Sequence, residues 1–496
     1  MTPLWLTDLP RPARLRVTPG LRSDVVVLGG GLTGLTTALL LAQNGIDVTV
    51  VEARRIGEGT TGASTAKVSL LQGVRGQRIR RRHSADSLRM YLDANAEGQR
   101  WLLDYCAHAG VPVQYADAYT YAQSDREVER VRAEHRVLEQ AGLPVELVES
   151  LEVPFPAKTA VRLADQAQLN PMALLAVLAA EVESHGVQIF ESSRAQGVRS
   201  GKSGGFLIDT EHGPIEAGTV ILATGTPILD RGGFFARLVP QRSYLTAFRL
   251  PAPAPTGMYI SAGEPTRSLR QVPDPDGDIL LVGGNGHTVG RDSDTAARVG
   301  DLVSWTQRYF AVDDPMATWS AQDYYPTGEL PHAGPLLPGQ DGILIATGYA
   351  KWGLTNAVAA ALALAGRITG KPPHWSGALA SWRPTDATGI PAALTANGSV
   401  ALQFSAGWLH VARTGDEPAP PEGCGRVNRR LLSPTATSTV DGVTTAVSAI
   451  CPHLYGIVRW NTADQSWDCP LHGSRFAPDG TLLEGPATKP LRRLPD

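Results

Sequence analysis

The sequence predicts a large α/β domain with a doubly wound parallel sheet and an inserted β-rich domain, followed by a small all-β domain. An apolar segment, DVVVLG (24–29), leads into a glycine turn, an amphipathic helix and a second apolar segment, DVTVVEA (47–53). This is how a doubly wound sheet begins. The order strand, glycine turn, helix returns in GILIATGYAKWGLTNAV (342–358). From about residue 396 we expect short strands and turns without a long helix, as in a small β domain.

The middle of the chain mixes helical and β-like patterns. The spacing of apolar residues predicts helices over 85–109, 125–141, 171–185 and about 293–309. It predicts an apolar strand in TVILATGTP (219–227) and further strands over about 241–289. Pro and small residues gather before the last domain, so we interpret 376–395 as a linker.

Length, composition and charge limit the function classes. The 496 residues suggest two to four domains of roughly 100–200 residues each. With 43% hydrophobic and 19% charged residues, the chain is globular rather than disordered. A net charge of −3 gives no global positive field, so we expect no nucleic-acid partner. One segment is strongly basic, and we interpret it as a solvated helix face, with an acidic partner or a cofactor phosphate as the alternative. Its arginines are Arg75, Arg78, Arg80, Arg81 and Arg82.

The apolar runs are short. LTTALLLA (35–42) and AVAAALALAG (357–366) do not approach the roughly 18–20 residues that span a bilayer. The first residues carry Pro and charges where a signal peptide needs an apolar core. We therefore expect no membrane span and a cytoplasmic location. Four cysteines are too few to stabilise a chain of this length by disulfide bonds. We expect Cys106 and Cys424 to be plain thiols.

The turn after the first strand carries Gly29, Gly31 and Gly34 in a GxGxxG pattern. The first glycine permits a tight turn, the second lets the backbone approach a pyrophosphate, and the third allows close packing of helix on strand. The start of the helix offers N–H groups and a positive dipole end to phosphates. Glu52, 18 positions after Gly34, would accept hydrogen bonds from ribose hydroxyls. This context predicts a dinucleotide site, with a simple glycine turn as the alternative.

Three further segments resemble the glycine oxidase/D-amino acid oxidase/sarcosine oxidase superfamily of FAD-dependent oxidoreductases. They are RRIGEGTTGASTAK (54–67), TVILATGTP (219–227) and GYAKWGLTN (348–356). The resemblance implies a Rossmann-type FAD-binding domain with an inserted substrate domain. It implies further FAD contacts at Leu32, Thr33, Ala53, Arg54, Thr60, Thr61, Ser64, Thr65, Lys67, Val198, Thr224, Gly225, Gly348, Gly353, Leu354 and Thr355.

The resemblance also divides the chain. Residues 1–21 would be an extension, and 22–375 would form the oxidoreductase part. Within it, the FAD-binding segments would be 22–84, 165–235 and 335–375, and the substrate domain about 85–164 and 236–334. The last domain would cover 396–496.

Cys451-Pro-His453 and Cys469-Pro-Leu-His472 form a CxH…CxxH pattern with 15 residues between His453 and Cys469. This matches a Rieske [2Fe–2S] centre, in which two His replace two Cys on one iron. Zinc is the alternative, although it more often takes C-x₂₋₄-C and H-x₃₋₅-H spacing. Ser474 lies where its hydroxyl could donate to a cluster sulfide, which would raise the reduction potential.

The stretch 396–494 resembles Rieske ferredoxin domains. Gly456 and Leu471 stand where high-potential respiratory Rieske proteins carry a disulfide, and Phe476 stands where they commonly carry Tyr. Both departures favour the lower part of the broad Rieske potential range.

Together the two motifs predict an enzyme that moves electrons between substrate, flavin and cluster. We expect an amine or amino acid to give a hydride to flavin N5, with an imine as product. The cluster would then pass single electrons to an external ferredoxin-like or quinone partner, with exposed cluster histidines as the exit. In a second hypothesis NAD(P)H or a ferredoxin reduces the protein, which feeds a partner oxygenase. Because we find no second nucleotide motif, NAD(P)H is disfavoured there. A non-enzymatic redox sensor or carrier is the third hypothesis.

Candidate catalytic residues carry weaker signals. We expect His287 to face the flavin, with a structural histidine as the alternative. Arg270 could hold a substrate carboxylate bidentately, with an ordinary ion pair as the alternative. Family oxidases commonly carry a lysine near N5, and DILLVGG (278–284), the matching strand, has none. Lys351, with Lys67, could partly substitute, or both could be surface lysines. Trp352 could cover the flavin or pack in the core.

Overall fold

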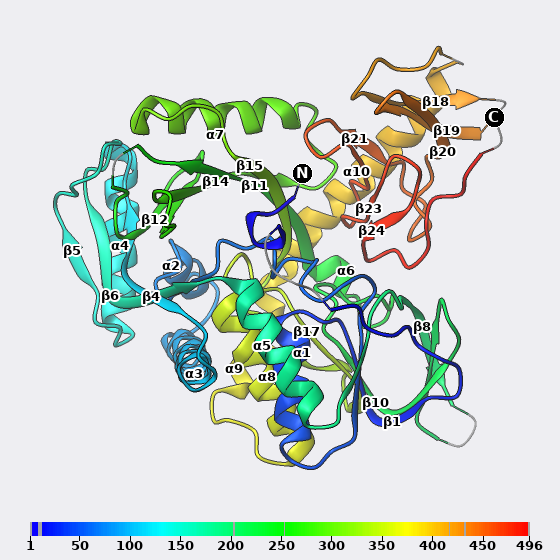
Figure 1. Ribbon diagram of the computed structural model, residues 1–496, viewed down its shortest axis with the longest axis horizontal. Helices are drawn as coiled ribbons and strands as arrows, with labels where there is room; N and C mark the ends of the chain where they lie inside the picture. The colour runs from blue at the N-terminus through cyan, green and yellow to red at the C-terminus, as the bar shows by residue number, and fades with distance from the viewer. Residues whose placement is uncertain are drawn as a thin grey trace.

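The computed structural model describes residues 2–7, 12–201, 204–251, 253–415, 417–430 and 433–494. Part of the expected N-terminal extension, residues 1 and 8–11, and the last two residues of the expected C-terminal domain lie outside the described residues. Figure 1 shows two large sheets with helices around them, and a smaller β domain joined to them by a long helix.

The first sheet is the doubly wound sheet that the sequence predicted. Its strand order is β16–β17–β10–β1–β2–β7, with β9 added beside β10 and β8 beside β9. β1, β2, β7, β10 and β17 run parallel. Their bounds are β1 Arg22–Leu28, β2 Val48–Val51, β7 Gln188–Phe190, β8 Ala195–Ser200, β9 Phe206–Thr210, β10 Ile215–Leu222, β16 His332–Leu337 and β17 Gln340–Thr347.

The C-terminal parts of β1 and β10 are apolar and buried because both faces of a parallel sheet are covered. All four residues of β2 are buried. The helices α1 Leu32–Ala42, α5 Pro171–Ser184 and α8 Gly353–Thr369 pack side by side on this part of the molecule. The expected strand–turn–helix units at 24–44 and 342–370 are confirmed.

The second sheet is antiparallel for the most part and has the order β15–β11–β14–β13–β12–β4–β6–β3, with β5 beside β6. Its strands are β3 Lys67–Val68, β4 Val113–Tyr121, β5 Glu146–Val148, β6 Ala160–Leu169, β11 Leu238–Arg249, β12 Met258–Ser261, β13 Arg267–Val272, β14 Ile279–Thr288 and β15 Ala317–Pro326. β3 lies within 22–84, so this predicted FAD-binding segment contributes a strand to the other sheet. The helices of this region are α2 Arg75–Arg80, α3 Ala85–Ala109, α4 Asp125–Gln140, α6 Phe234–Arg237 and α7 Thr295–Phe310.

The predicted helix over 85–109 coincides with α3, whose ends show why the sequence defines it. The Ser84 hydroxyl accepts a hydrogen bond from the Ser87 N–H at the start, which satisfies one free backbone donor. Gly110 ends the helix with a left-handed backbone, φ 69°, a conformation that glycine adopts at little cost.

The basic segment is only partly the solvated helix face that we expected. Arg75 is 4% exposed, and its guanidinium bonds the Tyr91 hydroxyl and forms an ion pair with Glu329. Arg78, which is exposed, pairs with the same carboxylate at 3.1 Å. The interpretation is wrong for Arg75 because α2 is covered by neighbouring elements on one side. Arg80 and Arg81 remain exposed and Arg82 is partly exposed.

The C-terminal domain consists of two small sheets, one with β18 Gly425–Arg430, β19 Ser433–Val440 and β20 Val443–Ser448, the other with β21 Arg459–Asn461, β22 Ser466–Asp468, β23 Arg475–Phe476 and β24 Leu482–Glu484. Its side chains form a separate core that includes Val447, Trp467 and Phe476. The small all-β domain is therefore confirmed.

The expectation of no long helix after residue 396 is wrong. The segment interpreted as a linker contains α9 Ser376–Leu379, the 3₁₀ helix η2 Pro384–Gly389 and the first residues of the 24-residue helix α10 Ile390–Arg413. The proline that suggested a break lies in the first turn of α10, where a missing N–H costs nothing. Val411 is buried in the core of the β domain, so tertiary packing stabilises this helix. Figure 1 shows α10 running from the large domain to the β domain.

In the described part of the chain, each helix is too short or too polar to cross a membrane.

Candidate functional site

A cavity of about 340 Å³ lies where the carboxyl ends of β1, β2, β10 and β17 face the second sheet. Ligands of open α/β sheets bind at such edges. The residues singled out from the sequence that line it are Gly29, Gly31, Leu32, Thr33, Glu52, Ala53, Arg54, Thr60, Thr61, Ser64, Thr65, Lys67, Thr224, Gly225, Gly348, Lys351, Trp352, Gly353 and Leu354.

The glycine turn brings the start of α1 to the cavity. A Cβ on Gly29 would lie 2.4 Å from the Ala223 carbonyl oxygen, and one on Gly34 would lie 1.9 Å from the Gly29 carbonyl oxygen. Gly34 does not line the cavity; it lets α1 pack directly on the turn. Gly31 is the N-cap and has no side chain to cap the helix. The positive end of α1 therefore points to the cavity, as the motif predicts.

Glu52 follows β2 and is held by two backbone donors. The Gly30 N–H donates to its Oε2 at 2.7 Å, and the Arg54 N–H donates to its Oε1 at 2.9 Å. These bonds fix the carboxylate at the cavity wall, where each oxygen keeps a free lone pair for a ribose hydroxyl.

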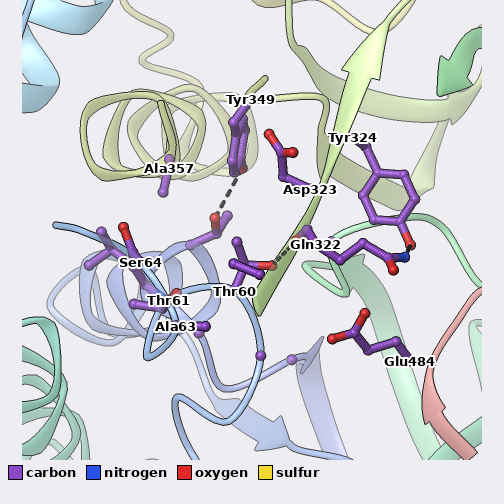
Figure 2. Close-up of a pocket in the computed structure, with 18 of the residues that line it drawn as sticks. Thr60, Thr61, Ala63, Ser64, Gln322, Asp323, Tyr324, Tyr349, Ala357 and Glu484 are labelled. Atoms are coloured by element: carbon purple, nitrogen blue, oxygen red, sulfur yellow. Dashed lines mark hydrogen bonds between the residues drawn. The ribbon is translucent and has the colours of Figure 1, made fainter. Parts of the chain in front are cut away.

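The loop 54–67 curves along the cavity and joins it to the second sheet. The Thr60 hydroxyl donates to the Gln322 carbonyl oxygen at 2.7 Å. The Thr61 hydroxyl accepts from the Leu32 N–H at 3.3 Å, and the Ser64 hydroxyl accepts from the Ala66 N–H at 2.9 Å. Figure 2 shows these three side chains on one side of the cavity.

The turn before α8 forms the opposite wall. Its backbone is left-handed at Gly348 (φ 83°) and at Lys351 (φ 74°), and Asp323 accepts a hydrogen bond from the Lys351 N–H. The Tyr349 hydroxyl lies 3.0 Å from the Thr33 hydroxyl, which joins this turn to the first glycine motif (Figure 2). Trp352 is the N-cap of α8, so the start of this helix also meets the cavity.

Two lysines line the cavity. Lys67 is buried, and its ammonium donates to the Tyr259 carbonyl oxygen and the Ser268 hydroxyl, each at 2.8 Å. Burial and the charge of Arg270 hold the pKa of Lys67 well below its usual value. Lys351 is exposed, as the surface-lysine alternative expected. Desolvation lowers its pKa, but Tyr325 and Asp323 raise it more, so the net direction is upward. The interpretation of Lys67 as a surface lysine is therefore wrong.

Besides Gly34, two predicted cofactor contacts do not line the cavity. Val198 lies in an apolar cluster under the first sheet, and Arg194 and Ala195 line the cavity in its place. Thr355 is turned into the protein, where its hydroxyl donates to Asn95 Oδ1 at 2.6 Å. α8 is helical from Gly353, and this turns Thr355 away from the face that Gly353 and Leu354 present.

Two predicted catalytic residues are held by contacts with other parts of the protein. Arg270 donates to the carbonyl oxygens of Thr65 and Leu169 at 2.6 and 3.1 Å, so its guanidinium holds the loop 54–67 rather than a carboxylate. His287 stacks on Tyr244, with Nε2 3.2 Å from the tyrosine hydroxyl. Burial lowers the pKa of His287. Neither side chain lines the cavity. Each is held by contacts with residues distant in the sequence, which the sequence pattern does not reveal.

Other lining residues gave no sequence signal. Asp323 and Gln322 lie on β15, and Ser243 lies on β11, far along the chain from the glycine motifs. The C-terminal domain contributes Leu483, Glu484, Gly485, Ala487 and Thr488. No spacing rule relates these segments, because they meet only when the sheets and domains pack.

The four predicted metal ligands lie together at two loop tips. The sulfurs of Cys451 and Cys469 share a hydrogen bond that lowers the pKa of Cys451 and raises that of Cys469. The rings of His453 and His472 are 5.1 Å apart. Burial lowers the pKa of His472 to about 4, so its imidazole is neutral at neutral pH, the form that binds metal. Leu471 packs over Gly456, where a Cβ would lie 2.5 Å away.

The expectation that exposed histidines form an electron exit is wrong. The side chains of His453 and His472 are 6% and 5% exposed, because the segment after β10 covers them. His453 Nε2 lies 2.6 Å from Asp230 Oδ1, and the Phe235 ring lies 5.3 Å from the His472 ring. Both imidazoles therefore face the large domain.

The residues present fit both predicted cofactors. The cavity combines two helix starts, the Glu52 carboxylate and a hydroxyl-rich loop, which are the donors and acceptors that an FAD requires. At the loop tips, both ring nitrogens of His472 are buried without a hydrogen-bond partner among the described residues. Such an orphaned imidazole next to two thiols and a second imidazole fits the Cys₂His₂ set of a Rieske cluster.

Comparison with known proteins agrees with this reading. The family model for FAD-dependent oxidoreductases of the DAO type matches residues 24–367, and that for the Rieske [2Fe-2S] domain matches 419–495. A Rieske 2Fe-2S iron-sulfur protein of Bacillus subtilis (strain 168), YhfW, is 28% identical over 99% of this chain and 97% of its own length. A cytochrome b6-f complex iron-sulfur subunit of Nostoc is 52% identical over 8% of this chain and 24% of its own length.

Solved structures share the fold of the large domain. Glycine oxidase from Geobacillus kaustophilus has a TM-score of 0.60 at 20% identity, covering 71% of this chain and 96% of its own. L-Amino acid deaminase from Proteus vulgaris has a TM-score of 0.61 at 15% identity, covering 75% and 100%. With the family match to more than half of its length, the chain belongs to the DAO family of FAD-dependent oxidoreductases and carries a Rieske [2Fe–2S] domain after it.

Proposed function

We propose that this protein oxidises an amino acid or a related amine and delivers the electrons singly to an external acceptor. When bound, FAD supplies a two-electron acceptor for the C–H bond beside the nitrogen, which leaves an imine, and the Rieske cluster supplies a one-electron carrier. The similarity in fold to an amino acid oxidase and an amino acid deaminase supports this substrate class.

The observation that carries the proposal is the contact between the cluster ligands and the wall of the cavity. Ile228 lines the cavity, and two residues later Asp230 meets His453. Gln322 also lines the cavity, and its Nε2 donates to the carbonyl oxygen of Gly473, next to His472, at 2.8 Å. Two short connections, made of covalent and hydrogen bonds, thus link the two cofactor sites. Electron transfer from flavin to cluster within one chain needs such a short path.

An external acceptor would meet the cluster on its other side. In the loop that holds Cys451 and His453, Pro452 and Tyr455 are exposed, and Tyr455 is 65% exposed. We therefore place the exchange of electrons with a ferredoxin-like or quinone partner at this loop tip rather than at the imidazoles. All four cysteines lie outside disulfides, which fits a reducing compartment and the proposed cytoplasmic location.

A second cavity, of about 310 Å³, adjoins the first and shares Lys351 and Trp352 with it. The arginines Arg78, Arg81 and Arg130 and one carboxylate, Glu264, lie on its wall, so that positive charge predominates there. A cationic approach to the cavity favours an amine that also carries a carboxylate, and so an amino acid over a simple amine. In this arrangement Lys351 lies at the junction, where it would meet the carboxylate.

Asp323 is the group best placed to accept a proton from the substrate ammonium. Its carboxylate lies in the cavity beside the turn 348–354. Burial raises the pKa of Asp323 to about 6, against the opposing charge of Lys351. Because only the ionised form can accept the proton, we expect kcat/KM to rise as the pH increases through about 6.

Asp323→Asn should lower kcat/KM by about 10²-fold and abolish the rise near pH 6, since a general base contributes about 10²–10⁴-fold. Asparagine keeps an acceptor for the Lys351 N–H, so the turn should persist, whereas Asp323→Ala should lose both. Asp341→Asn, at an exposed ion pair with Arg367, is the control. If the Asn variant keeps the rise near pH 6, another group is the base.

The direction of electron flow is tested by anaerobic absorption spectra of the purified protein during addition of amines and amino acids, then of NADH and NADPH. Loss of the flavin band followed by loss of the Rieske bands with an amino acid alone is the expected result. Reduction by NAD(P)H alone would contradict the proposal and favour a reductase that feeds a partner oxygenase. If neither an amino acid nor NAD(P)H bleaches the flavin, the result would favour a non-enzymatic carrier.

A further inference from the structure

The Rieske domain forms part of the wall of the flavin cavity. The segment Leu483–Thr488, which includes the end of β24, lines the cavity together with Glu52, Arg54 and Thr224. Figure 2 shows Glu484 from this segment on the same cavity wall as Gln322 and Tyr324. Burial raises the pKa of Glu484, but the positive charges of Arg242, Arg475 and Arg54 outweigh it, and the pKa is lowered overall.

Hydrogen bonds tie this segment to residues that line the cavity from the large domain. The Arg194 guanidinium donates to the Leu482 carbonyl oxygen at 3.2 Å, and the Tyr324 hydroxyl donates to the Gly485 carbonyl oxygen at 3.3 Å. Movement of the Rieske domain away from the large domain would break these bonds and open the cavity along this edge.

A buried ion network continues the contact beyond the cavity. Arg242 of β11 donates to Asp464 at 2.5 Å, and Arg475 donates to the same carboxylate at 3.0 Å. Although burial opposes it, Arg242 and Arg475 lower the pKa of Asp464 to about 2. Outside the cavity, Arg291 donates to the Pro470 carbonyl oxygen at 2.9 Å. Of these contacts, Arg242–Asp464 and Arg291–Pro470 join the two domains, whereas Arg475 and Asp464 both lie in the Rieske domain.

We propose that the Rieske domain completes the FAD-binding site, so that FAD binding and docking of the Rieske domain stabilise each other. A ligand that contacts both domains binds more tightly when they are docked, and by linkage its binding favours the docked state to the same extent. The inference needs only FAD binding and holds whatever the substrate is.

The coupling reaches the cluster ligands. In the docked state Asp230 and Phe235 cover His453 and His472. When FAD is removed, the Rieske domain spends more time undocked and both imidazoles gain access to solvent. FAD thus controls whether the cluster faces the flavin or the surroundings.

Hydrogen–deuterium exchange on the full chain, with and without FAD, tests the coupling directly. We expect FAD to slow exchange in the peptide that contains 483–488 and in the peptide that contains 230–235, as well as in the loop 54–67. Protection confined to the loop 54–67 and the glycine turns would overturn the proposal, because FAD would then bind the large domain alone.

A docking variant outside the cavity tests the reciprocal effect. Arg291→Gln removes a contact to the Rieske domain without touching the cavity lining, and we expect it to weaken FAD binding by about tenfold, within the range of couplings between linked sites. Arg493→Gln, at an exposed ion pair with Asp479 inside the Rieske domain, should change the FAD Kd by less than about twofold. FAD fluorescence gives both values.

The Rieske absorbance and the melting temperature of each variant show that the domain stays folded and loaded. An unchanged FAD Kd in Arg291→Gln, with faster exchange at 230–235, would show undocking without loss of FAD affinity and would overturn the proposal. If Arg291→Gln fails to fold, Thr295→Val, which removes the acceptor for the Ala463 N–H at 3.1 Å, replaces it and carries the same expectation.

Discussion

Cys469→Ser should abolish the Rieske cluster while FAD remains bound. Removing a residue that only hydrogen-bonds a metal ligand lowers metal affinity by about 10–100-fold. Removing a thiolate ligand itself should therefore lower the affinity for the cluster by more than about 10²-fold. With the cluster absent, substrate should still bleach the flavin, whereas reduction of an external one-electron acceptor should fall by a similar factor. The Rieske absorption bands, the Rieske EPR signal and iron content measure the cluster, and anaerobic flavin absorbance measures the first step.

Cys424→Ser is the matched control, because Cys424 lies in the same domain and outside the ligand motif. It should retain cluster, flavin and acceptor reduction. If Cys469→Ser reduced the acceptor as fast as the unmodified protein, electrons would leave the flavin directly and the cluster would not be on the route. If the protein held zinc instead of iron, neither the absorption bands nor the EPR signal would be present before the substitution.

Gly34→Ala should unfold the first glycine turn and prevent FAD binding. A methyl group at this position would lie 1.9 Å from the Gly29 carbonyl oxygen, and neither backbone can move without separating α1 from β1. Overpacking of this kind costs about 1–3 kcal/mol and occasionally more, so we expect a loss of about 3 kcal/mol in the free energy of unfolding. Thermal unfolding and the flavin content of the purified protein measure the two effects.

Gly300→Ala provides the control, since a Cβ at Gly300 in α7 has no atom within 4 Å. This change should leave FAD content unaltered and stabilise the helix by about 0.5–1 kcal/mol. A Gly34→Ala protein that bound FAD with ordinary affinity would contradict the role of close packing in forming the site.

Local segments of the chain carry much of the fold. α3 matches its predicted range because Ser84 and Gly110 cap an amphipathic stretch, and such caps act within a few residues. The metal ligands were identified from spacing because a Rieske centre takes one Cys and one His from each of two short loops. In the same way Gly29, Gly31 and Glu52 lie within one β–α–β unit, so a local pattern places all three at the cavity.

Tertiary structure decided the rest. Asp323 comes from a strand of the other sheet, and Glu484 comes from the other domain, so only packing brings them to the cavity. Arg270 and His287 have residue types suited to catalysis, but their partners are a carbonyl oxygen and a tyrosine far away in the sequence. The sequence predicted the cluster, yet not the direction its histidines face, since Asp230 lies 223 residues before His453. Motifs specify chemistry that short segments can hold by themselves, whereas burial, orientation and contact between domains depend on the packing of the whole chain.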